Sequence, residues 1–404
     1  MKNVRSSFLW DLAEIFHEVM DMSNATTVFR ELFAGVLAMG DWTIWVMFLI
    51  GGLLIYLGVR KGYEPVLLFP MGVGCILANI PGHFAVVPTG GGEPGFLTVL
   101  YKMGIANELF PVLIFIGIGA MCDFTPLLRK PYMMLFAAAA HLGIFAATLC
   151  AALVGFPFNE AASIGIIGAA DGPTTIFVAQ KFATEMLAPL TVTAFCYMSL
   201  VPIIQPPVVK LLTTREERLI RMPYQEEKPV SKTALFLFPL MVTLIAGIIA
   251  PISVPLIGAL MFGNLLKVSG CTDSLAGCAQ NELTNLVTLL LGITVGATMT
   301  AENILTLQVL KILCLGAVAF IFDTVGGLLF AKLANLFLKK KINPMIGACG
   351  ISAFPISGRV ISRMALQEDP TNFILQPAIG VNVAGQVASV VAGGLVMALI
   401  PVLM

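Results

Sequence analysis

Long runs of apolar residues, most of them about as long as one membrane crossing, follow one another from residue 42 to the end of the chain. A helix needs about 20 apolar residues to span a bilayer. We therefore predict spans over 42–59, 64–80, 107–122, 132–154, 187–206, 233–250, 251–266, 285–299, 307–332 and 374–403. Two further apolar stretches, 161–180 and 343–362, are interrupted by glycine, proline and polar residues. We predict a broken, re-entrant helix element in each.

The segments outside these stretches are polar or rich in glycine and proline. Residues 1–40 include the stretch 8–21, whose apolar residues fall on one helical face, as is typical of an amphipathic helix in the membrane interface. Residues 27–39 are a second such candidate. The stretch 81–106 contains the run GHFAVVPTGGGEPGF, for which we predict an irregular loop. Residues 207–232 are charged, and we interpret them as a cytoplasmic linker between two halves, 41–206 and 233–404.

The two halves resemble each other in the positions of several polar and small residues. Each has five predicted crossings plus one broken element, and an odd number of crossings gives two linked repeats opposite orientations. Inverted repeats with a broken helix in each are typical of transporters that bind substrate at the midplane. Chance similarity among apolar helices is the alternative. The matched pairs are Asn79 with Asn264, Gly119-Ala120 with Gly296-Ala297, Asn159 with Asn343, and Tyr197 with Asn382.

Composition and charge agree with an all-α polytopic membrane protein. Of the 404 residues, 58% are hydrophobic and 11% charged, whereas soluble domains carry about 25% charged residues. The net charge of zero leaves no basic surface for nucleic acid. The positive-inside rule places the linker side in the cytoplasm. On this topology the linker side has Arg60, Lys61, Arg129, Lys130, Lys210, Arg215, Arg218, Arg221, Lys228, Lys232, Lys267, Lys332, Lys339, Lys340, Lys341 and Arg363, and the other side has Lys102, Lys181 and Lys311.

The cysteines and histidines show no pattern of a metal site. The eight cysteines occur singly and form no CxxC pair, so we expect reduced packing residues. The three histidines lie far apart in the sequence.

The first broken element contains a carboxylate where lipid disfavours it. It reads GIIGAADGPTTIF from Gly165 to Phe177 and includes Asp171. An ionised carboxylate at the centre of a membrane helix costs about 2.5–3.5 kcal/mol. Asp-Gly-Pro cannot continue a regular helix, because proline lacks an N–H donor and restricts the residue before it. A broken helix at membrane depth is tolerated only where it lines a cavity, and in transporters it forms ion sites.

The second broken element and the span after it supply neutral oxygens and one cation. They contain Asn343, Gly347, Ser352, Arg359 and Asn382. One carboxylate with neutral oxygens suits a monovalent cation such as Na⁺, and the ligand types leave K⁺ or a proton open. Asp171 as a buried structural partner of Arg359 is one alternative, and Arg359 snorkelling to the interface is another. Asp323 is a further acid deep in apolar sequence, with no assigned role.

At GAADGPTTIF the sequence resembles the membrane β subunit of the sodium-pumping biotin-dependent decarboxylases. Further stretches agree: LFPVLIFIGIGAMCDFTPLL at 109–128, NPMIGACGISAFPISGRV at 343–360, and NVAGQVASVVAGG at 382–394. The resemblance runs from about residue 40 to the end. It departs from the family's common pattern at Gly358, where alanine is frequent, and at Val381, where proline is frequent.

The resemblance implies a sodium pump of the bacterial inner membrane, active only with partner subunits. The expected partners are a carboxyltransferase α subunit, a biotin carrier protein or domain, a small membrane γ or δ subunit, and further copies of this chain. The expected cofactors are Na⁺ and carboxybiotin carried by a partner. By resemblance, Asp171, Tyr197 and Arg359 act in catalysis, with Arg359 also near carboxybiotin. Na⁺ ligation falls on Asp171, Asn343, Gly347, Ser352 and Asn382.

The mechanistic hypothesis couples decarboxylation of carboxybiotin to Na⁺ export with proton consumption. Na⁺ binds Asp171 from the cytoplasm, Tyr197 or Asp171 relays a proton, and protonation of Asp171 releases Na⁺ outward. A stand-alone sodium-coupled carboxylate transporter is one alternative. A structural anchor for a soluble enzyme is another, and it leaves the buried Asp171 unexplained.

Overall fold

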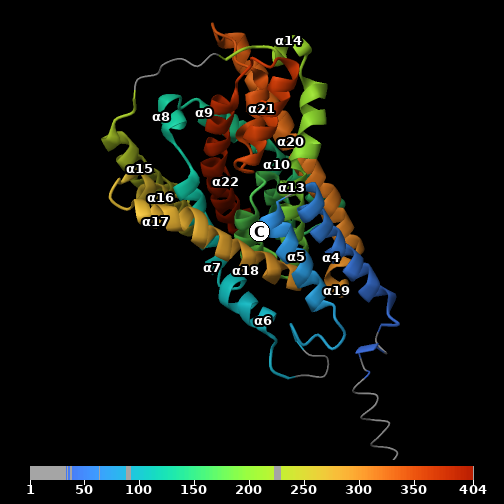
Figure 1. The fold of residues 1–404 in the computed structure, drawn as a ribbon. Helices are drawn as coiled ribbons and strands as arrows, with labels where there is room; N and C mark the ends of the chain where they lie inside the picture. Colours follow the sequence, from blue (N-terminus) through green and yellow to red (C-terminus); the bar gives the residue numbers. More distant parts are fainter. Residues whose placement is uncertain are drawn as a thin grey trace, which may run out of the picture.

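The computed structural model describes residues 33, 35–36, 39–62, 64–87, 92–222 and 229–403, and these residues form helices and connecting turns without a β strand. The amphipathic helix predicted at 8–21, and most of the one predicted at 27–39, lie outside the described residues. Figure 1 shows the arrangement of the helices.

The first half of the chain runs from α4 to α13. Three of its short elements deviate from α-helical geometry: η1 is π-helical, and η2 and η3 are 3-10 helices. The elements are α4 (Trp42–Lys61), α5 (Pro65–Ala78), α6 (Phe96–Leu100), η1 (Tyr101–Ile105), α7 (Leu109–Met121), α8 (Thr125–Arg129), α9 (Met133–Ala140), α10 (Leu142–Val154), α11 (Phe158–Gly165), η2 (Ile166–Ala169), α12 (Gly172–Phe182), η3 (Thr184–Met186) and α13 (Leu187–Leu212).

The second half follows a similar order. Here η5 is π-helical, and η4 and η6 are 3-10 helices. The elements are α14 (Arg215–Arg218), α15 (Lys232–Ile249), η4 (Pro251–Ser253), α16 (Val254–Val268), α17 (Asp273–Cys278), η5 (Ala279–Leu283), α18 (Thr284–Ala297), α19 (Ala301–Ile304), α20 (Leu307–Phe337), η6 (Pro344–Gly350), α21 (Ile356–Glu368) and α22 (Leu375–Leu403).

The structure confirms the expected all-α polytopic membrane protein. Seven helical segments among the described residues are long and apolar enough to cross a bilayer. The pair formed by Phe96–Ile105 and Leu109–Met121 also passes this test together, but it bends by 61°. The predicted spans coincide with these helices and with the shorter α5 and α18, because a continuous apolar run marks each of them.

Three details differ from the prediction. The stretch 81–106 is not wholly irregular, because the apolar residues after Gly95 form α6 and η1. The span predicted at 187–206 continues past Pro206 and Pro207 to Leu212, since Val209 is buried and keeps the helix packed. The span predicted at 132–154 is divided at His141 into α9 and α10.

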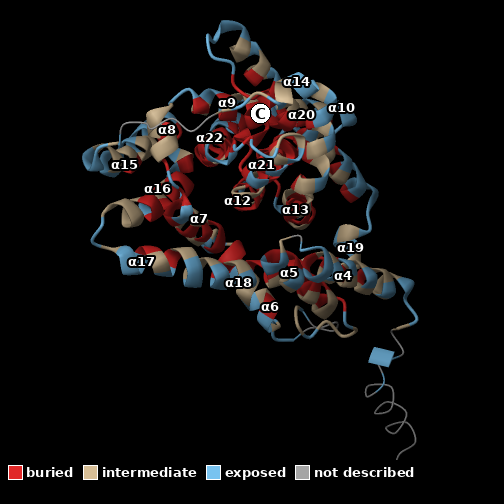
Figure 2. Ribbon diagram, turned by 45° about the horizontal axis from the view of Figure 1, so that its top comes forward, coloured by how far each residue is buried: buried red, intermediate tan, exposed pale blue. Residues whose placement is uncertain are grey.

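The spans gather into two groups. The first bundle consists of α4, α5, α7, α15, α16 and α18, and the second bundle consists of α9–α13 and α20–α22 with η2 and η6. Figure 2 shows α16, α7, α18, α5 and α4 of the first bundle as a row along one side of the second bundle. Both broken elements belong to the second bundle.

Two close helix crossings hold the first bundle together, and each joins one helix from either half. A Cβ built on Gly74 of α5 would lie 2.1 Å from the Ile293 carbonyl oxygen of α18. A Cβ built on Gly119 of α7 would lie 1.8 Å from the Leu260 carbonyl oxygen of α16. Only glycine permits such an approach of backbone to backbone.

Two matched asparagines tie the same crossings. Asn79 Nδ2, after α5, donates to the Met299 carbonyl at 2.7 Å, just past the end of α18. Asn264 Nδ2, in α16, donates to the Cys122 carbonyl at 3.1 Å, at the end of α7. Each asparagine therefore helps to satisfy a carbonyl at a helix end, together with Lys267 Nζ at the Cys122 carbonyl and Cys75 Sγ at the Met299 carbonyl.

Candidate functional site

The first broken element breaks at a short irregular step between η2 and α12. Ala170 adopts a left-handed conformation with φ of 54°. Asp171 is extended and is the N-cap of α12, where its Oδ1 accepts from the Thr174 N–H at 3.3 Å. Pro173 lies in the first turn, where its missing N–H costs nothing. Asp-Gly-Pro thus both ends the preceding helical segment and begins α12.

Asp171 is enclosed by neutral hydroxyl groups and is 3% exposed. Its Oδ2 accepts from Thr174 Oγ1 at 2.7 Å, from Ser389 Oγ at 3.0 Å and from Ser352 Oγ at 3.3 Å. Thr174 belongs to α12, Ser389 to α22 and Ser352 to the second broken element. No ion pair with Asp171 is found within the described ranges, so the charge of its carboxylate is left for a ligand to compensate.

The two broken elements meet at this carboxylate. The backbone N–H of Ser352, just after η6, donates to the Ala169 carbonyl at the end of η2 at 3.1 Å. Ser352 Oγ also lies 3.0 Å from Ser389 Oγ. The predicted site residues Asp171 and Ser352, from opposite halves of the chain, are therefore in direct contact.

Residues of α22 complete the enclosure with amide groups. Asn382 Nδ2 donates to the Ile351 carbonyl at 2.7 Å and to the Cys349 carbonyl at 3.2 Å. Gln386 Nε2 donates to the Ser352 carbonyl. The side-chain oxygens of both amides, Asn382 Oδ1 and Gln386 Oε1, are buried without a hydrogen-bond partner. A buried unpaired oxygen is costly, and these two are free to bind a cation.

Gln386 and Ser389 were not among the predicted site residues. The spacing of Asn382, Gln386 and Ser389 is i, i+4 and i+7, which places all three on one face of a helix. That spacing was the available signal. Thr174 has no such signal, because its position follows from the N-cap geometry of Asp171.

Two predicted site residues, Asn343 and Gly347, make their contacts away from Asp171. Asn343 Nδ2 donates to the carbonyls of Arg218 and Ile220 at 2.8 and 3.0 Å, and its Oδ1 accepts from the Met345 N–H at 3.1 Å. Asn343 therefore fixes the segment after α13 to the start of η6. A Cβ on Gly347 would lie 2.1 Å from the Gly327 carbonyl oxygen of α20, so Gly347 allows η6 to pack against α20.

Tyr197 and Arg359 lie apart from the carboxylate. Tyr197 OH donates to the Leu313 carbonyl at 2.6 Å, and its ring stacks on Phe320 with centroids 6.4 Å apart. Arg359, in α21, is exposed. Across from it is Glu64 in the turn before α5: burial raises the pKa of Glu64, and the charge of Arg359 lowers it. Arg359 is therefore close enough to the first bundle to influence a carboxylate there.

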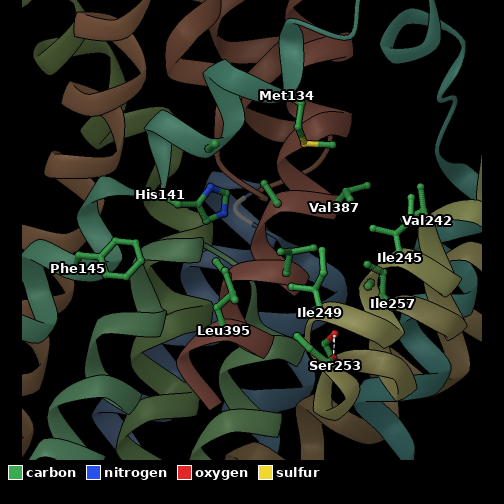
Figure 3. Close-up of a pocket in the computed structure, with 16 residues that line it drawn as sticks. Met134, His141, Phe145, Val242, Ile245, Ile249, Ser253, Ile257, Val387 and Leu395 are labelled. Atoms are coloured by element: carbon green, nitrogen blue, oxygen red, sulfur yellow. Dashed lines mark hydrogen bonds between the residues drawn. The ribbon is translucent and has the colours of Figure 1, made fainter. Parts of the chain in front are cut away.

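A separate cavity of about 470 Å³ lies between the bundles on the other side of α22. Figure 3 shows apolar side chains of α9, α10, α15, α16 and α22 surrounding it. His141 and Ser253 are its polar side chains. None of the predicted site residues lines this cavity, so it does not coincide with the carboxylate site.

Comparison with known proteins agrees with these features. A family model described as the Na⁺-transporting oxaloacetate decarboxylase beta subunit matches residues 43–400. The chain is 47% identical over 359 residues to the glutaconyl-CoA decarboxylase subunit beta of Acidaminococcus fermentans, covering 89% of this chain and 94% of that protein.

Two further relatives are named for other substrates. The methylmalonyl-CoA decarboxylase subunit beta of Veillonella parvula is 45% identical, covering 88% of this chain and 92% of the relative. The oxaloacetate decarboxylase beta chain of Klebsiella pneumoniae is 39% identical, covering 87% and 94%. The chain therefore belongs to the family of beta subunits of the Na⁺-transporting decarboxylases.

Proposed function

We propose that this membrane subunit of a decarboxylase sodium pump binds Na⁺ at Asp171 and exports it while carboxybiotin is decarboxylated at its cytoplasmic side. The observation that carries the proposal is the contact between the two broken elements. One buried carboxylate lies there among hydroxyl and amide oxygens and has no cation as partner in the described parts of the chain. Isolated charges inside a membrane mark ion pathways.

The oxygens around Asp171 suit a monovalent cation. Na⁺ is a hard cation and prefers oxygen ligands. One carboxylate supplies a single negative charge, and Ser352, Ser389, Asn382 and Gln386 supply neutral oxygens, two of which are unpaired. Bound Na⁺ would balance the charge and satisfy these oxygens at once. We propose Ser389 and Gln386 as ligands in addition to the predicted Ser352 and Asn382.

The same geometry favours a role other than direct ligation for Asn343 and Gly347. The hydrogen bonds of Asn343 are directed to the backbone of the linker segment, and Gly347 faces α20. Both hold η6 in place, and η6 presents Ser352 to Asp171. We propose that they position the ligands.

Release of Na⁺ requires removal of the negative charge that holds it. Protonation of Asp171 would do this, and Tyr197 or Asp171 itself would relay the proton that the reaction consumes. Moving one positive charge outward against 100 mV costs about 2.3 kcal/mol. Decarboxylation of carboxybiotin supplies this free energy. The switch must therefore be tied to the chemical step.

We propose that the cytoplasmic anion docks near Arg359. The guanidinium is exposed, whereas Asp171 is enclosed, so the two charges face different ligands. A guanidinium binds a carboxylate in a two-point geometry. Arg359 would hold the carboxyl group of carboxybiotin until CO₂ leaves.

We also propose that the halves 41–206 and 233–404 are inverted repeats whose bundles move against each other. The paired contacts of Asn79 and Asn264, and the paired glycine crossings, support this arrangement. A π-helical segment precedes the third span in both halves, although η5 continues directly into α18 whereas η1 is followed by a 61° bend before α7. Transporters built from inverted repeats expose a midplane site alternately to either side.

The subunit needs partners that bring the carboxyl group to it. The relatives differ in the acid named for them, although their membrane subunits are similar to this chain. We propose that a carboxyltransferase α subunit selects the acid, that a biotin carrier protein or domain delivers it as carboxybiotin, and that a small membrane γ or δ subunit and further copies of this chain complete the complex. Sensitivity of Na⁺ transport to avidin would test the biotin requirement.

The proposal is tested by Asp171→Asn in the intact complex reconstituted into vesicles. We expect Na⁺ uptake coupled to decarboxylation to be lost, because asparagine is neutral and cannot compensate Na⁺. The matched control is Asp123→Asn, which removes an exposed acid whose Oδ1 accepts from the Thr125 N–H at 2.9 Å. Coupled uptake that survives in Asp171→Asn would refute the ligand role.

A further inference from the structure

A second acid is fully buried in the second bundle and has no role in the proposed ion site. Asp323 lies in the middle of α20 and is 0% exposed. No side chain among the described residues hydrogen-bonds to its carboxylate oxygens, and the donors nearest to them are the backbone N–H groups of Gly143 and Ile144. A charged carboxylate without a cation or a side-chain donor in a low-dielectric interior is far more costly than a neutral one.

Two glycines make room for this carboxyl group. A Cβ built on Gly143, at the start of α10, would lie 2.3 Å from Asp323 Oδ1. A Cβ built on Gly168, in η2, would lie 2.8 Å from Asp323 Oδ2. Each carboxylate oxygen thus lies against a position where only glycine leaves space, and one of these positions is three residues before Asp171.

The surroundings contain no counter-charge. The nearest basic residues along α20 are Lys311, about three turns before Asp323, and Lys332, more than two turns after it. Lys332 pairs with Glu217 at 3.2 Å. Helix α20 packs against α9, α10, α11, α13, η2 and η6. Among the described residues of these elements, α9 and η2 carry no ionisable side chain. The ionisable residues of α10, α11, α13, η6 and the α9–α10 junction are His141, Cys150, Glu160, Cys196, Tyr197, Lys210 and Cys349.

None of these ionisable groups hydrogen-bonds to Asp323. His141 Nδ1 lies 2.6 Å from the Ala137 carbonyl, and Tyr197 OH is bound to the Leu313 carbonyl. Lys210 is exposed near the cytoplasmic end of α13. Among the described residues no group balances a negative charge on Asp323. Only a ligand small enough for the space between the two glycines could neutralise it.

We propose that Asp323 is a second, separate proton-binding site, occupied in the conformation seen here and emptied when η2 moves away from α20. A proton fits the observations better than Na⁺. Asp171 has five side chains with free or hydroxyl oxygens around it, whereas no hydroxyl or amide side chain is bonded to Asp323. A Na⁺ ion there would lack the oxygen ligands that it prefers.

The position of Asp323 couples its proton to the first broken element. Gly168 belongs to η2, which ends at Ala169, and the Ala169 carbonyl receives the hydrogen bond from Ser352. A neutral Asp323 allows η2 to rest against α20. An ionised Asp323 favours a conformation in which water reaches it, and this conformation displaces η2. The proton leaves to that water and returns from it, so no other reactant is required. The assignment of η2 as a moving part rests on the proposed function.

The protonation state is tested by infrared difference spectroscopy of the intact complex, which detects the C=O stretch of a protonated carboxylic acid. We expect such a band in the wild-type protein, shifted in heavy water, retained in Asp171→Asn and absent from Asp323→Asn. Adding Na⁺ and the carboxylated substrate should change its intensity in the wild-type protein. Absence of an Asp323-dependent band, or a band that does not respond to turnover, would overturn the proposal.

A second measurement separates this proposal from the ion site and from simple misfolding. Asp323→Asn is a neutral isostere of the protonated acid, so we expect a wild-type Tm together with a fall in coupled turnover of about tenfold, within the usual range of coupling between sites. Wild-type turnover in Asp323→Asn would contradict the proposal. Should this variant fail to assemble, Asp171→Asn carrying isotopically labelled aspartate decides the question, since its acid band must then shift with the label. Failure of the proposed function would instead appear as coupled uptake in Asp171→Asn.

Discussion

The two broken elements meet at one point but bring different chemistry to it. In the first, residues 161–179 are all buried and Asp171 provides the charge. In the second, Ser352 and the Cys349 and Ile351 carbonyls are the groups near the contact, and the charged residue, Arg359, is exposed in α21. The enclosed anion and the exposed cation are thus carried by different elements. One element is suited to hold a cation within the membrane, and the other to meet an anion at its surface.

The breaks themselves also have different causes. The first is encoded locally, because Asp-Gly-Pro caps α12 and cannot extend the helix before it. The second is held by packing. Its 3-10 segment η6 has seven residues, whereas such runs rarely exceed about four. Gly347 against Gly327, and Gly350 against the Phe136 carbonyl, allow η6 to lie this close to α20 and α9. A local break tolerates changes around it that a packed break does not.

The largest effect expected from this comparison is that of Gly347→Ala. The new methyl group would meet the Gly327 carbonyl oxygen at 2.1 Å, and neither backbone can yield easily. Overpacking of this kind costs about 3 kcal/mol. We expect a marked fall in Tm of the purified complex in detergent, measured by thermal unfolding.

Gly358→Ala in the same broken element is the matched control. Its methyl group would lie 2.7 Å from Ile379 Cδ1, the end of a flexible side chain, so the Tm should change little. A wild-type Tm for Gly347→Ala combined with a loss of Na⁺ dependence would instead assign Gly347 to the ion.

A smaller effect is expected when single hydroxyls next to Asp171 are removed. Ser389→Ala and Ser352→Ala each delete one donor to Asp171 Oδ2, at 3.0 and 3.3 Å. Hydrogen bonds to charged groups contribute about 1.5–3 kcal/mol. We expect each substitution to raise the Na⁺ concentration for half-maximal decarboxylation by about tenfold, with maximal rate at saturating Na⁺ retained.

Ser357→Ala distinguishes this effect from general disturbance of the second element. Ser357 Oγ bonds to Gln205 Oε1 at 3.0 Å and to the Ala348 carbonyl at 3.3 Å, away from Asp171. Its removal should leave the Na⁺ dependence unchanged. Equal shifts in all three serine variants would mean that the hydroxyls act through structure and not as ligands.

The sequence predicted those features that are encoded locally. Continuous apolar runs located the spans, and Asp-Gly-Pro located both the first break and its buried acid. The contacts of Asn343 could not be predicted, because they depend on where Arg218 and Ile220 fold back. The same is true of Asp323: its sequence shows an acid in apolar surroundings, and only the structure shows that its neighbours are two glycines.

The smallest expected effect concerns the negative charge of Glu64, which opposes the exposed cation Arg359. Glu64 lies in the turn between α4 and α5, and its electrostatic interaction with Arg359 crosses from the first bundle to the second. An anion docking at Arg359 must compete with this carboxylate. Glu64→Gln removes the negative charge, so we expect the KM for the carboxylated biotin carrier to fall by about threefold, as for a partly screened charge pair, with Na⁺ dependence unchanged.

The pH dependence of the KM gives a second test of this competition between Glu64 and the incoming anion. Burial raises the pKa of Glu64 above its usual 4.5, so its negative charge is lost at a higher pH than for an ordinary glutamate as the medium is acidified. The wild-type KM should therefore approach that of Glu64→Gln as the medium is acidified, while the variant shows no such change. If the gap between the two proteins stays constant, or if Glu64→Gln raises KM, Glu64 does not compete for Arg359. The cation of the second element would then face the incoming anion without an opposing charge from the first bundle.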